Sequence, residues 1–210
     1  MNDHSAIMRN LTPVTEPPAK REAILSAAIL LFSERTFDGT AMPLIAERAQ
    51  VGAGTIYRYF DSKEALVNAV YRKWKAEMKR ILVDEAPRDV TPRTEFGHWW
   101  QGLWRFAQEN PAAFTFLETH HHESYLDAES RALAATLLEG TREFVRRAQD
   151  SGAVRCMDGD LLIAMVFGSF TGLIKSTEMI RLEVTPALVA ETEECVWTMI
   201  SNNDMTRGGQ

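Results

Sequence analysis

Cysteine is scarce in this sequence, with only Cys156 and Cys195 among its 210 residues. Two cysteines so far apart supply neither a disulfide framework nor the short spacing of a cysteine metal site. A reduced, cytoplasmic chain is therefore the expected class.

Long apolar runs are also missing. The longest, residues 161–174, falls short of the roughly 20 residues that a helix needs to cross a bilayer. Residues 1–19 contain no basic cluster followed by an apolar block, and Pro13, Pro17 and Pro18 would interrupt a helix there. We therefore expect a mobile arm at the start of the chain, no secretory signal and no contact with a membrane.

The sequence shows no sustained alternation of apolar and polar residues and no hairpin dipeptides, so a β-sheet is not expected. Almost every segment instead repeats apolar residues at the three- and four-residue spacing of a helix. The predicted helices span residues 20–35, 42–49, 53–60, 63–83, 92–109, 111–122, 127–149, 160–181 and 186–200. The fold is thus predicted to be all-α, with about nine helices in two unequal parts.

Four segments follow from this pattern. We predict a mobile N-terminal arm, a smaller helical domain with a linking fourth helix, a larger helical domain, and a C-terminal tail. They span residues 1–19, 20–83, 84–202 and 203–210. The border lies near residues 86–92, the first break that carries proline after the fourth helix.

Charge is distributed unevenly. The net charge of −6 argues against a nucleic-acid partner, but residues 1–80 hold 12 Lys and Arg against 9 Asp and Glu, a balance of +3. Residues 81–210 hold 11 against 20, a balance of −9. A basic front end on an acidic body suits a protein that meets phosphates with one end only.

Two short helices separated by the turn 50–52 predict a helix-turn-helix. With Ile56 and Phe60 buried at positions i and i+4, the opposite face of the second helix carries small residues and the hydroxyl of Tyr57 and guanidinium of Arg58. Such groups bind phosphate oxygens, and an arginine can also read a guanine edge. The alternative is a turn between two core helices, with the tyrosines in solvent.

The stretch 21–67 resembles the DNA-binding domain of TetR-family transcription regulators. The resemblance rests on A-x-x-L-F at 28–32, I-A-x-x-A at 45–49 and GTIYRYFDSKEAL at 54–66. It implies a homodimer that binds double-stranded operator DNA and leaves it when a small molecule binds the C-terminal domain. By the same resemblance, residues 20–83 are the helix-turn-helix DNA-binding domain and residues 84–202 the ligand-binding and dimerisation domain. The DNA contacts that it implies are Thr40, Ala53, Gly54, Thr55, Tyr57, Arg58, Tyr59 and Lys63, with Tyr57, Tyr59 and Lys63 mainly on phosphates and Thr55 and Arg58 at or near base edges.

Some residues depart from the common pattern of that family. Ala41 stands where a hydroxyl often caps the helix, and loss of such a cap costs about 1 kcal/mol. Gln50 occupies a turn position where glycine is frequent, so we expect its backbone to be left-handed at some cost. Gly52 and Ala53 replace a frequent Ser-Lys pair. The operator sequence cannot be read from these residues.

Aromatic residues are concentrated between residues 92 and 117. Trp100 and Trp104 are four residues apart, with Phe96 one turn earlier on the same face. Such rings are often plain core, but their number favours an apolar cavity for a small lipophilic or aromatic ligand. The predicted lining is Phe96, Trp100, Trp104, Phe114, Phe116, Met165 and Phe170, and the polar candidates are Arg105, Glu118 and Tyr125.

A ridge of small residues, Ala164, Gly168 and Gly172, permits close approach of another helix. In the TetR family the last two helices form the four-helix bundle of the dimer, which places these residues at the subunit interface. By the same resemblance, Val189, Val196, Trp197 and Ile200 would supply the apolar contacts. The alternative is core packing within one chain.

His120, His121 and His122 are consecutive, so their side chains point about 100° apart on a helix and cannot converge on one ion. We expect solvated imidazoles and no metal site or cofactor. No catalytic residues are expected either, because the sequence has no nucleophile motif, phosphate-binding loop or paired carboxylates. The prediction is a ligand-responsive repressor; the alternative is an all-helical small-molecule-binding protein or enzyme with an incidental helix-turn-helix.

Overall fold

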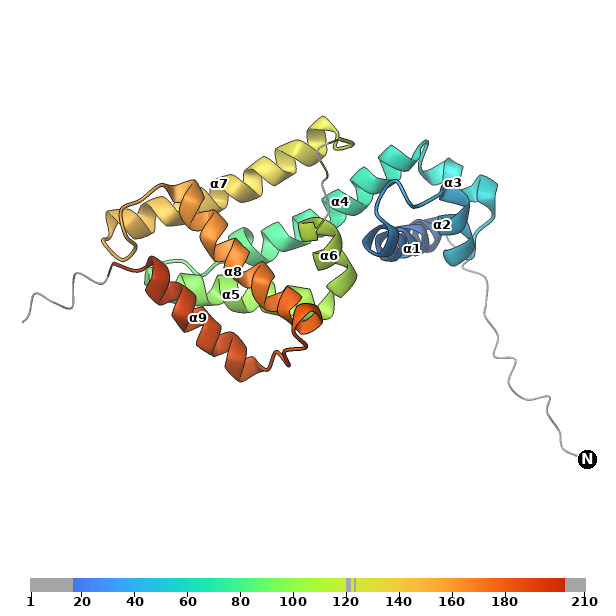
Figure 1. The fold of residues 1–210 in the computed structure, drawn as a ribbon. Helices are drawn as coiled ribbons and strands as arrows, with labels where there is room; N and C mark the ends of the chain where they lie inside the picture. Colours follow the sequence, from blue (N-terminus) through green and yellow to red (C-terminus); the bar gives the residue numbers. More distant parts are fainter. Residues whose placement is uncertain (1–16, 120–121, 123, 203–210) are drawn as a thin grey trace, which may run out of the picture. The chain divides into compact units, whose positions relative to one another are not determined.

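The computed structural model describes residues 17–119, 122 and 124–202. These residues are mostly helical and form no β-strand; the only β-type pairing among them is the isolated bridge between Val154 and Ser201. The prediction of an all-α fold is confirmed. The chain divides into two compact units, residues 1–70 and 71–210 (Figure 1).

The first unit contains three helices and the start of a fourth: α1 (Pro17–Arg35), α2 (Met42–Arg48), α3 (Ala53–Tyr59) and the first turns of α4 (Lys63–Lys79). Its core is made by apolar side chains at helical spacing, among them Phe32, Ile45 and Ile56, each at most 1% exposed. Burial of these side chains stabilises the unit because it removes apolar surface from water.

Gly39 makes the turn after α1 possible. A Cβ atom at this position would lie 2.2 Å from the carbonyl oxygen of Arg35, the last residue of α1. No side chain can be accommodated there without moving the backbone, so the direction in which the chain leaves α1 depends on glycine.

The second unit contains the rest of α4, the π-helical turn η1 (Arg80–Asp84), and five helices: α5 (Pro92–Glu109), α6 (Pro111–Thr119), α7 (Ala128–Asp150), α8 (Gly159–Met179) and α9 (Pro186–Ile200). Figure 1 shows α7 and α9 on opposite sides of this unit, with α5 and α8 between them.

Side-chain caps set the starts of four of these helices. Thr91, Asp127, Asp158 and Thr185 each accept a hydrogen bond from the backbone N–H three residues later. Such a cap satisfies an N–H group that the first turn of a helix leaves without a partner. The capping residues explain why the helix starts could be predicted from the sequence.

Trp100 lies at the centre of the second unit and is 1% exposed. Its ring stacks on Phe96 of the same helix (5.9 Å between ring centroids) and meets Phe170 of α8 edge-on (5.2 Å). Its indole Nε1 donates to the backbone carbonyl of Val189 in α9 (3.1 Å). This side chain therefore ties α5 to both C-terminal helices.

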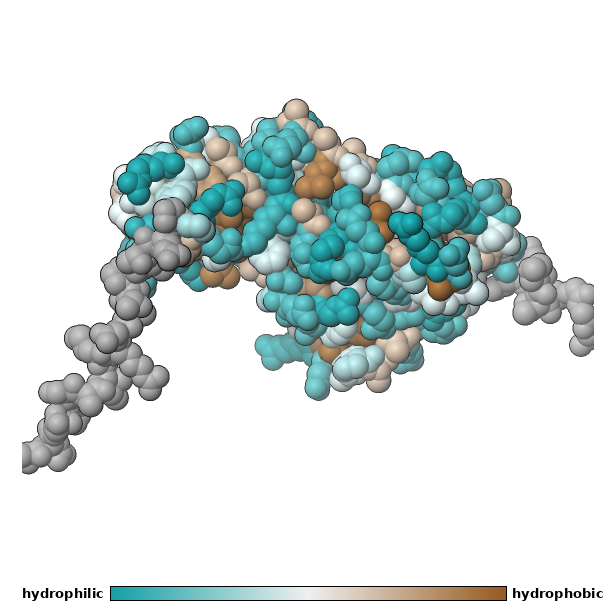
Figure 2. All heavy atoms as spheres, turned by 180° about the vertical axis from the view of Figure 1, so that it is seen from behind, coloured by the Kyte–Doolittle hydropathy of each residue, from teal (hydrophilic) through white to brown (hydrophobic). Residues whose placement is uncertain are grey.

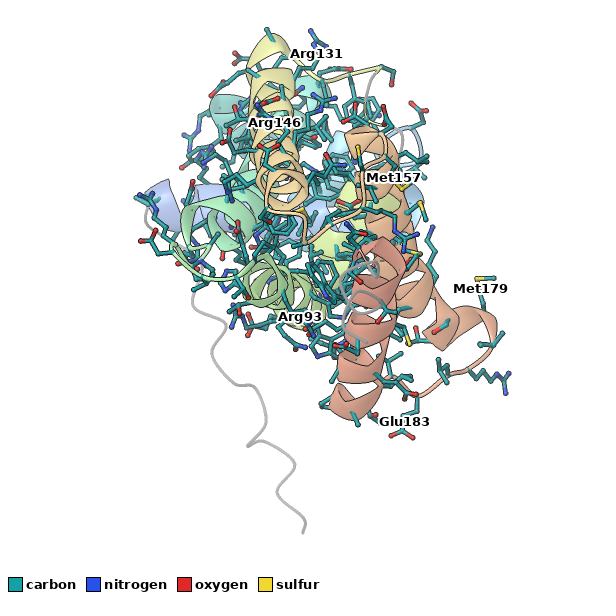
Figure 3. All side chains as sticks on the ribbon, turned by 90° about the vertical axis from the view of Figure 1, so that its left-hand side faces the viewer. Arg93, Arg131, Arg146, Met157, Met179 and Glu183 are labelled. Atoms are coloured by element: carbon teal, nitrogen blue, oxygen red, sulfur yellow. The ribbon has the colours of Figure 1, made fainter. Side chains whose placement is uncertain are left out.

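Charged side chains hold α5 to α9 at the edge of this core. Arg93 donates to Glu193 (2.6 Å) and Glu194 (2.8 Å), and Gln101 donates to Glu193 (2.7 Å). Glu193 is buried, and its carboxylate is satisfied by these two donors. Arg93 is visible at the edge of α5 in Figure 3.

The end of α4 differs from the prediction of one continuous helix to Val83. After Lys79 the chain forms a π-turn, in which the N–H of Glu85 bonds to the carbonyl of Arg80 (2.9 Å). The turn packs closely on two glycines: a Cβ on Gly102 would lie 2.7 Å from Ile81, and one on Gly140 would lie 2.9 Å from Val83. Tight packing on α5 and α7 thus accompanies the change in helix type.

The histidine run also differs from the prediction. His120 and His121 lie outside the described residues, but His122 is buried rather than solvated. Its Nε2 donates to the carbonyl of Phe116 (2.8 Å), and its Nδ1 accepts from the hydroxyl of Tyr125 (2.6 Å). A neutral imidazole satisfies both contacts, so His122 belongs to the core.

Candidate DNA-contacting helix and ligand cavity

The outer face of α3 is open to solvent. Ile56 (1% exposed) and Phe60 (5% exposed) anchor the helix in the core of the first unit. Gly54 has no atom within 4 Å of the position of a Cβ, and Tyr57 is 52% exposed. Ala53 and Arg58 are also exposed, whereas Thr55 and Tyr59 are half-buried. Ala53 and Gly54 leave the start of this face without long side chains, and the exposed Tyr57 and Arg58 place a hydroxyl and a guanidinium near its end.

The turn between α2 and α3 contains the expected strain. Gln50 adopts a left-handed backbone with φ of 55°, and its N–H bonds to the carbonyl of Glu47 (3.0 Å). At the other end of α2, Ala41 occupies the N-cap and provides no side-chain hydrogen bond. Both departures from the common sequence pattern therefore have the structural effect predicted for them.

Thr40 is enclosed by the first unit. Its side chain is 1% exposed, and its hydroxyl donates to the carbonyl of Thr36 (2.8 Å) and lies 3.2 Å from that of Leu31. The prediction placed Thr40 at the DNA. In this structure its side chain instead holds the loop before α2 against the end of α1.

Lys63, at the start of α4, also contacts that loop. Its Nζ donates to the carbonyls of Phe37 (2.9 Å) and Thr40 (3.2 Å) and lies 4.1 Å from the centre of the Phe37 ring. An ammonium group has three N–H donors. Two are used within the unit, and one is left for a phosphate.

The second unit encloses an apolar cavity of about 60 Å³. Its walls come from η1, α5, α7, α8 and α9 and from the bridge residue Val154. The lining residues are Leu82, Phe96, Trp99, Trp100, Leu103, Thr141, Phe144, Val145, Val154, Leu162, Ile163, Val166, Phe167 and Ile200.

The structure brings only part of the predicted lining to this cavity. Phe96 and Trp100 form its wall, whereas Trp104, Phe114, Phe116, Met165 and Phe170 do not. Phe114 and Phe170 pack against each other (5.8 Å between centroids) in the core. The wall from α7 was missed because Phe144 is the single aromatic residue of that helix and lies outside the aromatic-rich stretch 92–117.

None of the three polar candidates lines the cavity either. Arg105 is exposed, and Tyr125 bonds to His122. Glu118 lies beside Tyr71 of α4, and burial raises the pKa of its carboxyl group above the usual value although Lys75 is 3.8 Å away. Burial and the nearby Glu118 together raise the pKa of Tyr71 to about 12.

A second, larger hollow of about 580 Å³ lies next to the apolar cavity. It is bordered by η1 and the loop that follows it, the start of α5, and α7. Leu82, Trp99 and Phe144 belong to the walls of both spaces. We call this hollow the polar groove, because Arg88, Asp89, Glu95, Glu143 and Arg147 are among its lining residues.

One face of α8 is apolar and exposed. Gly168 and Gly172 have no atom within 4 Å of a Cβ position, and Ala164 is exposed beside them. Leu161 is 49% exposed and Met179 78%, and Figure 3 shows the Met179 side chain directed away from the ribbon. In contrast, Val189, Val196 and Ile200, which were predicted at the dimer interface, are buried within the unit, and Trp197 is half-buried.

By length and composition alone, Gly159–Thr177 could cross a membrane, which the sequence prediction did not allow for. Only 17% of that window is buried. On the face seen from behind in Figure 2, hydrophilic residues cover most of the surface and apolar residues form separate patches. Within the part of the chain that the structure describes, no three His, Cys, Asp or Glu side chains are grouped so that they could hold a metal ion.

Comparison with known proteins covers both units. Residues 24–70 match the family described as bacterial regulatory proteins, tetR family. Residues 71–202 match the tetracyclin repressor-like, C-terminal domain. The border between the two matches coincides with the border between the two compact units, inside α4.

Individual proteins that are similar to this chain are also described as regulators. An uncharacterized HTH-type transcriptional regulator of Haemophilus influenzae is 23% identical over 188 residues, 85% of this chain and 94% of that protein. RutR of Escherichia coli is 47% identical, but over 73 residues only, 33% of this chain and 34% of RutR. A solved structure of a proposed fatty acid metabolism regulator of Clostridium perfringens has a TM-score of 0.75 and 25% identity and covers 85% of this chain and 98% of its own. The chain belongs to the tetR family of bacterial regulatory proteins.

Proposed function

We propose that this protein is a cytoplasmic, homodimeric repressor that leaves a near-palindromic operator when a small lipophilic molecule binds its second unit. As a member of its family it is a DNA-binding transcription regulator. The observation that carries the proposal is the free outer face of α3, held on the core by Ile56 and Phe60.

This face has the chemistry of a DNA contact. Ala53 and Gly54 allow the backbone to approach a groove closely, while Tyr57, Tyr59 and the remaining donor of Lys63 can bind phosphate oxygens. Thr55 and Arg58 are proposed to lie at or near base edges, where a guanidinium can bind guanine with two hydrogen bonds. One helix this short reads only a few base pairs, so useful specificity needs two half-sites and a dimer.

The exposed face of α8 supports a dimer. Small residues at Ala164, Gly168 and Gly172 would let a helix of a second copy approach closely, and Leu161 and Met179 are free to be covered. Contiguous apolar surface of this kind is typical of protein–protein interfaces. Val189, Val196 and Ile200 are buried in the core of their own unit, so they are not part of the surface proposed for the dimer.

The apolar cavity supports a lipophilic ligand, and so does the likeness to a regulator assigned to fatty acid metabolism. Such a ligand releases DNA only if it binds one conformation of the dimer more tightly than the other. The shift in DNA affinity is then set by that difference in binding free energy.

A mobility-shift experiment with the DNA that flanks the protein's own gene tests the proposal. We expect a single specific complex whose footprint has dyad symmetry. Arg58→Ala should relax discrimination at particular base pairs, whereas Tyr57→Phe should weaken binding to all sequences alike. A footprint without dyad symmetry, or an unchanged preference profile for Arg58→Ala, would contradict the corresponding part of the proposal.

A further inference from the structure

Two neighbouring tryptophans in α5 differ in how their indole N–H groups are satisfied. Trp100 Nε1 donates to the carbonyl of Val189 at 3.1 Å. Trp99 Nε1 is buried, and it has no hydrogen-bond acceptor within the described part of the chain. A buried donor without a partner is costly in free energy, so native structures rarely keep one without a reason.

The position of Trp99 indicates what its partner could be. Its side chain belongs to the walls of both the apolar cavity and the polar groove. Its ring packs against Phe144 of α7, with 4.4 Å between centroids, and Phe144 also borders both spaces. Trp99 therefore lies between an apolar space and a polar one, and its Nε1, which is covered by its neighbours, is reached by a ligand oxygen only when a neighbouring side chain moves aside.

The apolar cavity supplies little polar surface. Apart from its two tryptophans, Thr141 is the one polar side chain of the lining; its hydroxyl donates to the carbonyl of Leu137 (3.1 Å), and Trp99 Nε1 forms no hydrogen bond with it. The cavity of about 60 Å³ can therefore take a short hydrocarbon or ring portion of a ligand but not a polar one.

The charges of the polar groove restrict the charge that the polar portion of a ligand can carry. Arg147 donates to Glu95 (2.8 and 3.1 Å) and lies 3.9 Å from Glu143, and Glu143 also accepts from Arg146 (3.3 Å), which is not among the lining residues. Of the lining residues, Glu95, Glu143 and Arg147 sum to one net negative formal charge. Arg88 and Asp89 in the loop cancel each other in formal charge. The groove therefore disfavours an anionic group and accommodates an uncharged or cationic one.

We propose that the apolar cavity and the polar groove form one site for an amphipathic ligand. Its apolar end fills the cavity, a carbonyl or similar oxygen accepts from Trp99 Nε1, and an uncharged or cationic head lies in the groove. This inference rests on the proposed function, because it specifies the ligand class of the regulator.

Three probes that share a six-carbon chain test it. Trimethyl(2-oxohexyl)ammonium has a carbonyl and a cationic head, hexyltrimethylammonium has the same chain length and head without the carbonyl, and hexyl sulfate has an anionic head. Their binding is measured by isothermal titration calorimetry on the full chain, as wild type and as Trp99→Phe. Trp104→Phe is the matched control, since Trp104 lines neither space.

We expect the wild type to bind trimethyl(2-oxohexyl)ammonium about tenfold more tightly than hexyltrimethylammonium, which corresponds to one hydrogen bond. Trp99→Phe should remove that difference and leave hexyltrimethylammonium binding within about twofold, and Trp104→Phe should change neither. Hexyl sulfate should bind most weakly. Circular dichroism checks that each variant is folded.

Other outcomes overturn the inference. Equal affinity for the two cationic probes would show that Trp99 Nε1 donates to no ligand carbonyl, and equal losses for both in Trp99→Phe would show that the indole contributes only through its ring. Absence of binding by all three, or preference for the sulfate, would refute the ligand class. If binding depends on Trp99 as expected but never releases operator DNA, the proposed function fails while the site stands.

Discussion

The ammonium group of Lys63 lies 3.2 Å from the carbonyl oxygen of Thr40, so the start of α4 is tied to the loop before α2. The second bond, to Phe37, and the contact with its ring make this side chain part of the fold of the first unit. A residue that the family resemblance assigns to DNA thus also positions the helix-turn-helix.

Lys63→Ala should therefore have two effects. It should lower the free energy of unfolding of the first unit by about 1–2 kcal/mol, because two charge-assisted hydrogen bonds are lost. It should also reduce the slope of log K against log salt for DNA by about one unit, because the remaining donor binds a phosphate. Urea unfolding and salt titrations measure the two effects separately. A lower stability with an unchanged salt slope would restrict Lys63 to the structural role.

Gln50→Gly should stabilise the first unit relative to Gln50→Ala by about 1 kcal/mol. The left-handed φ of 55° is strained for any residue with a Cβ and free of strain for glycine. Thermal unfolding of the two variants, which differ by one methyl group, gives the comparison. Equal melting temperatures would mean that the surrounding turn, and not the residue, bears the cost.

Asp127 makes the second unit sensitive to acid. Burial alone would raise the pKa of its carboxyl group, but hydrogen bonds from Ser130 and Arg72 outweigh it and lower the pKa to about 2. A lowered pKa contributes stability that is present above the unfolded value near 4 and is lost as the pH falls towards 2. Because the side chain is 46% exposed, solvent screening reduces the contribution to about 1 kcal/mol.

Asp127→Asn tests this contribution, since asparagine can still cap α7 but cannot pair with Arg72. The variant should be about 1 kcal/mol less stable than the wild type at pH 7, and the difference should vanish near pH 2. Urea unfolding at several pH values measures it. A difference that persists at pH 2 would assign the effect to the cap rather than to the charge.

Gly168→Glu should produce a folded monomer. Nothing within 4 Å opposes a side chain at this position in one subunit, so the fold should tolerate it. A carboxylate placed in an apolar interface would have to lose its hydration without a partner, which disfavours association. Sedimentation at micromolar concentration compares it with the wild type. Ala135→Glu, which adds the same carboxylate at an exposed position of α7, serves as a control; a wild-type monomer would contradict the dimer itself.

Much of the fold could be predicted because local signals agree with it. Thr91-Pro92 and Thr185-Pro186 combine a cap with a proline in the first turn, and α5 and α9 begin there as predicted. The buried face of α3 followed from the spacing of Ile56 and Phe60. The strain at Gln50 followed from the absence of glycine at that turn.

The cavity could be predicted only in part, because its lining depends on how distant helices pack. Periodicity places Trp100 and Trp104 on one face, yet only Trp100 reaches the cavity, while the neighbouring Trp99 borders both hollow spaces. Likewise, the sequence of an apolar stripe on α9 does not show whether the stripe faces the core of its own subunit or a second copy. In the structure, Val189 is fully buried in the core of its own subunit. Thr40 matched the family motif, but the motif carries no information on which way the hydroxyl points.

The π-turn at Arg80–Asp84 has a consequence for comparing this chain with its relatives. Such a turn holds one residue more than an α-helical turn, so it amounts to a single-residue insertion absorbed in the last turn of a helix. A relative whose helix stays α-helical to its end would align with a one-residue gap here, and an alignment without that gap would misplace by one position the residues between the turn and α5. Deleting one residue from the turn would likewise carry Leu82 away from the cavity, a change that no substitution reproduces.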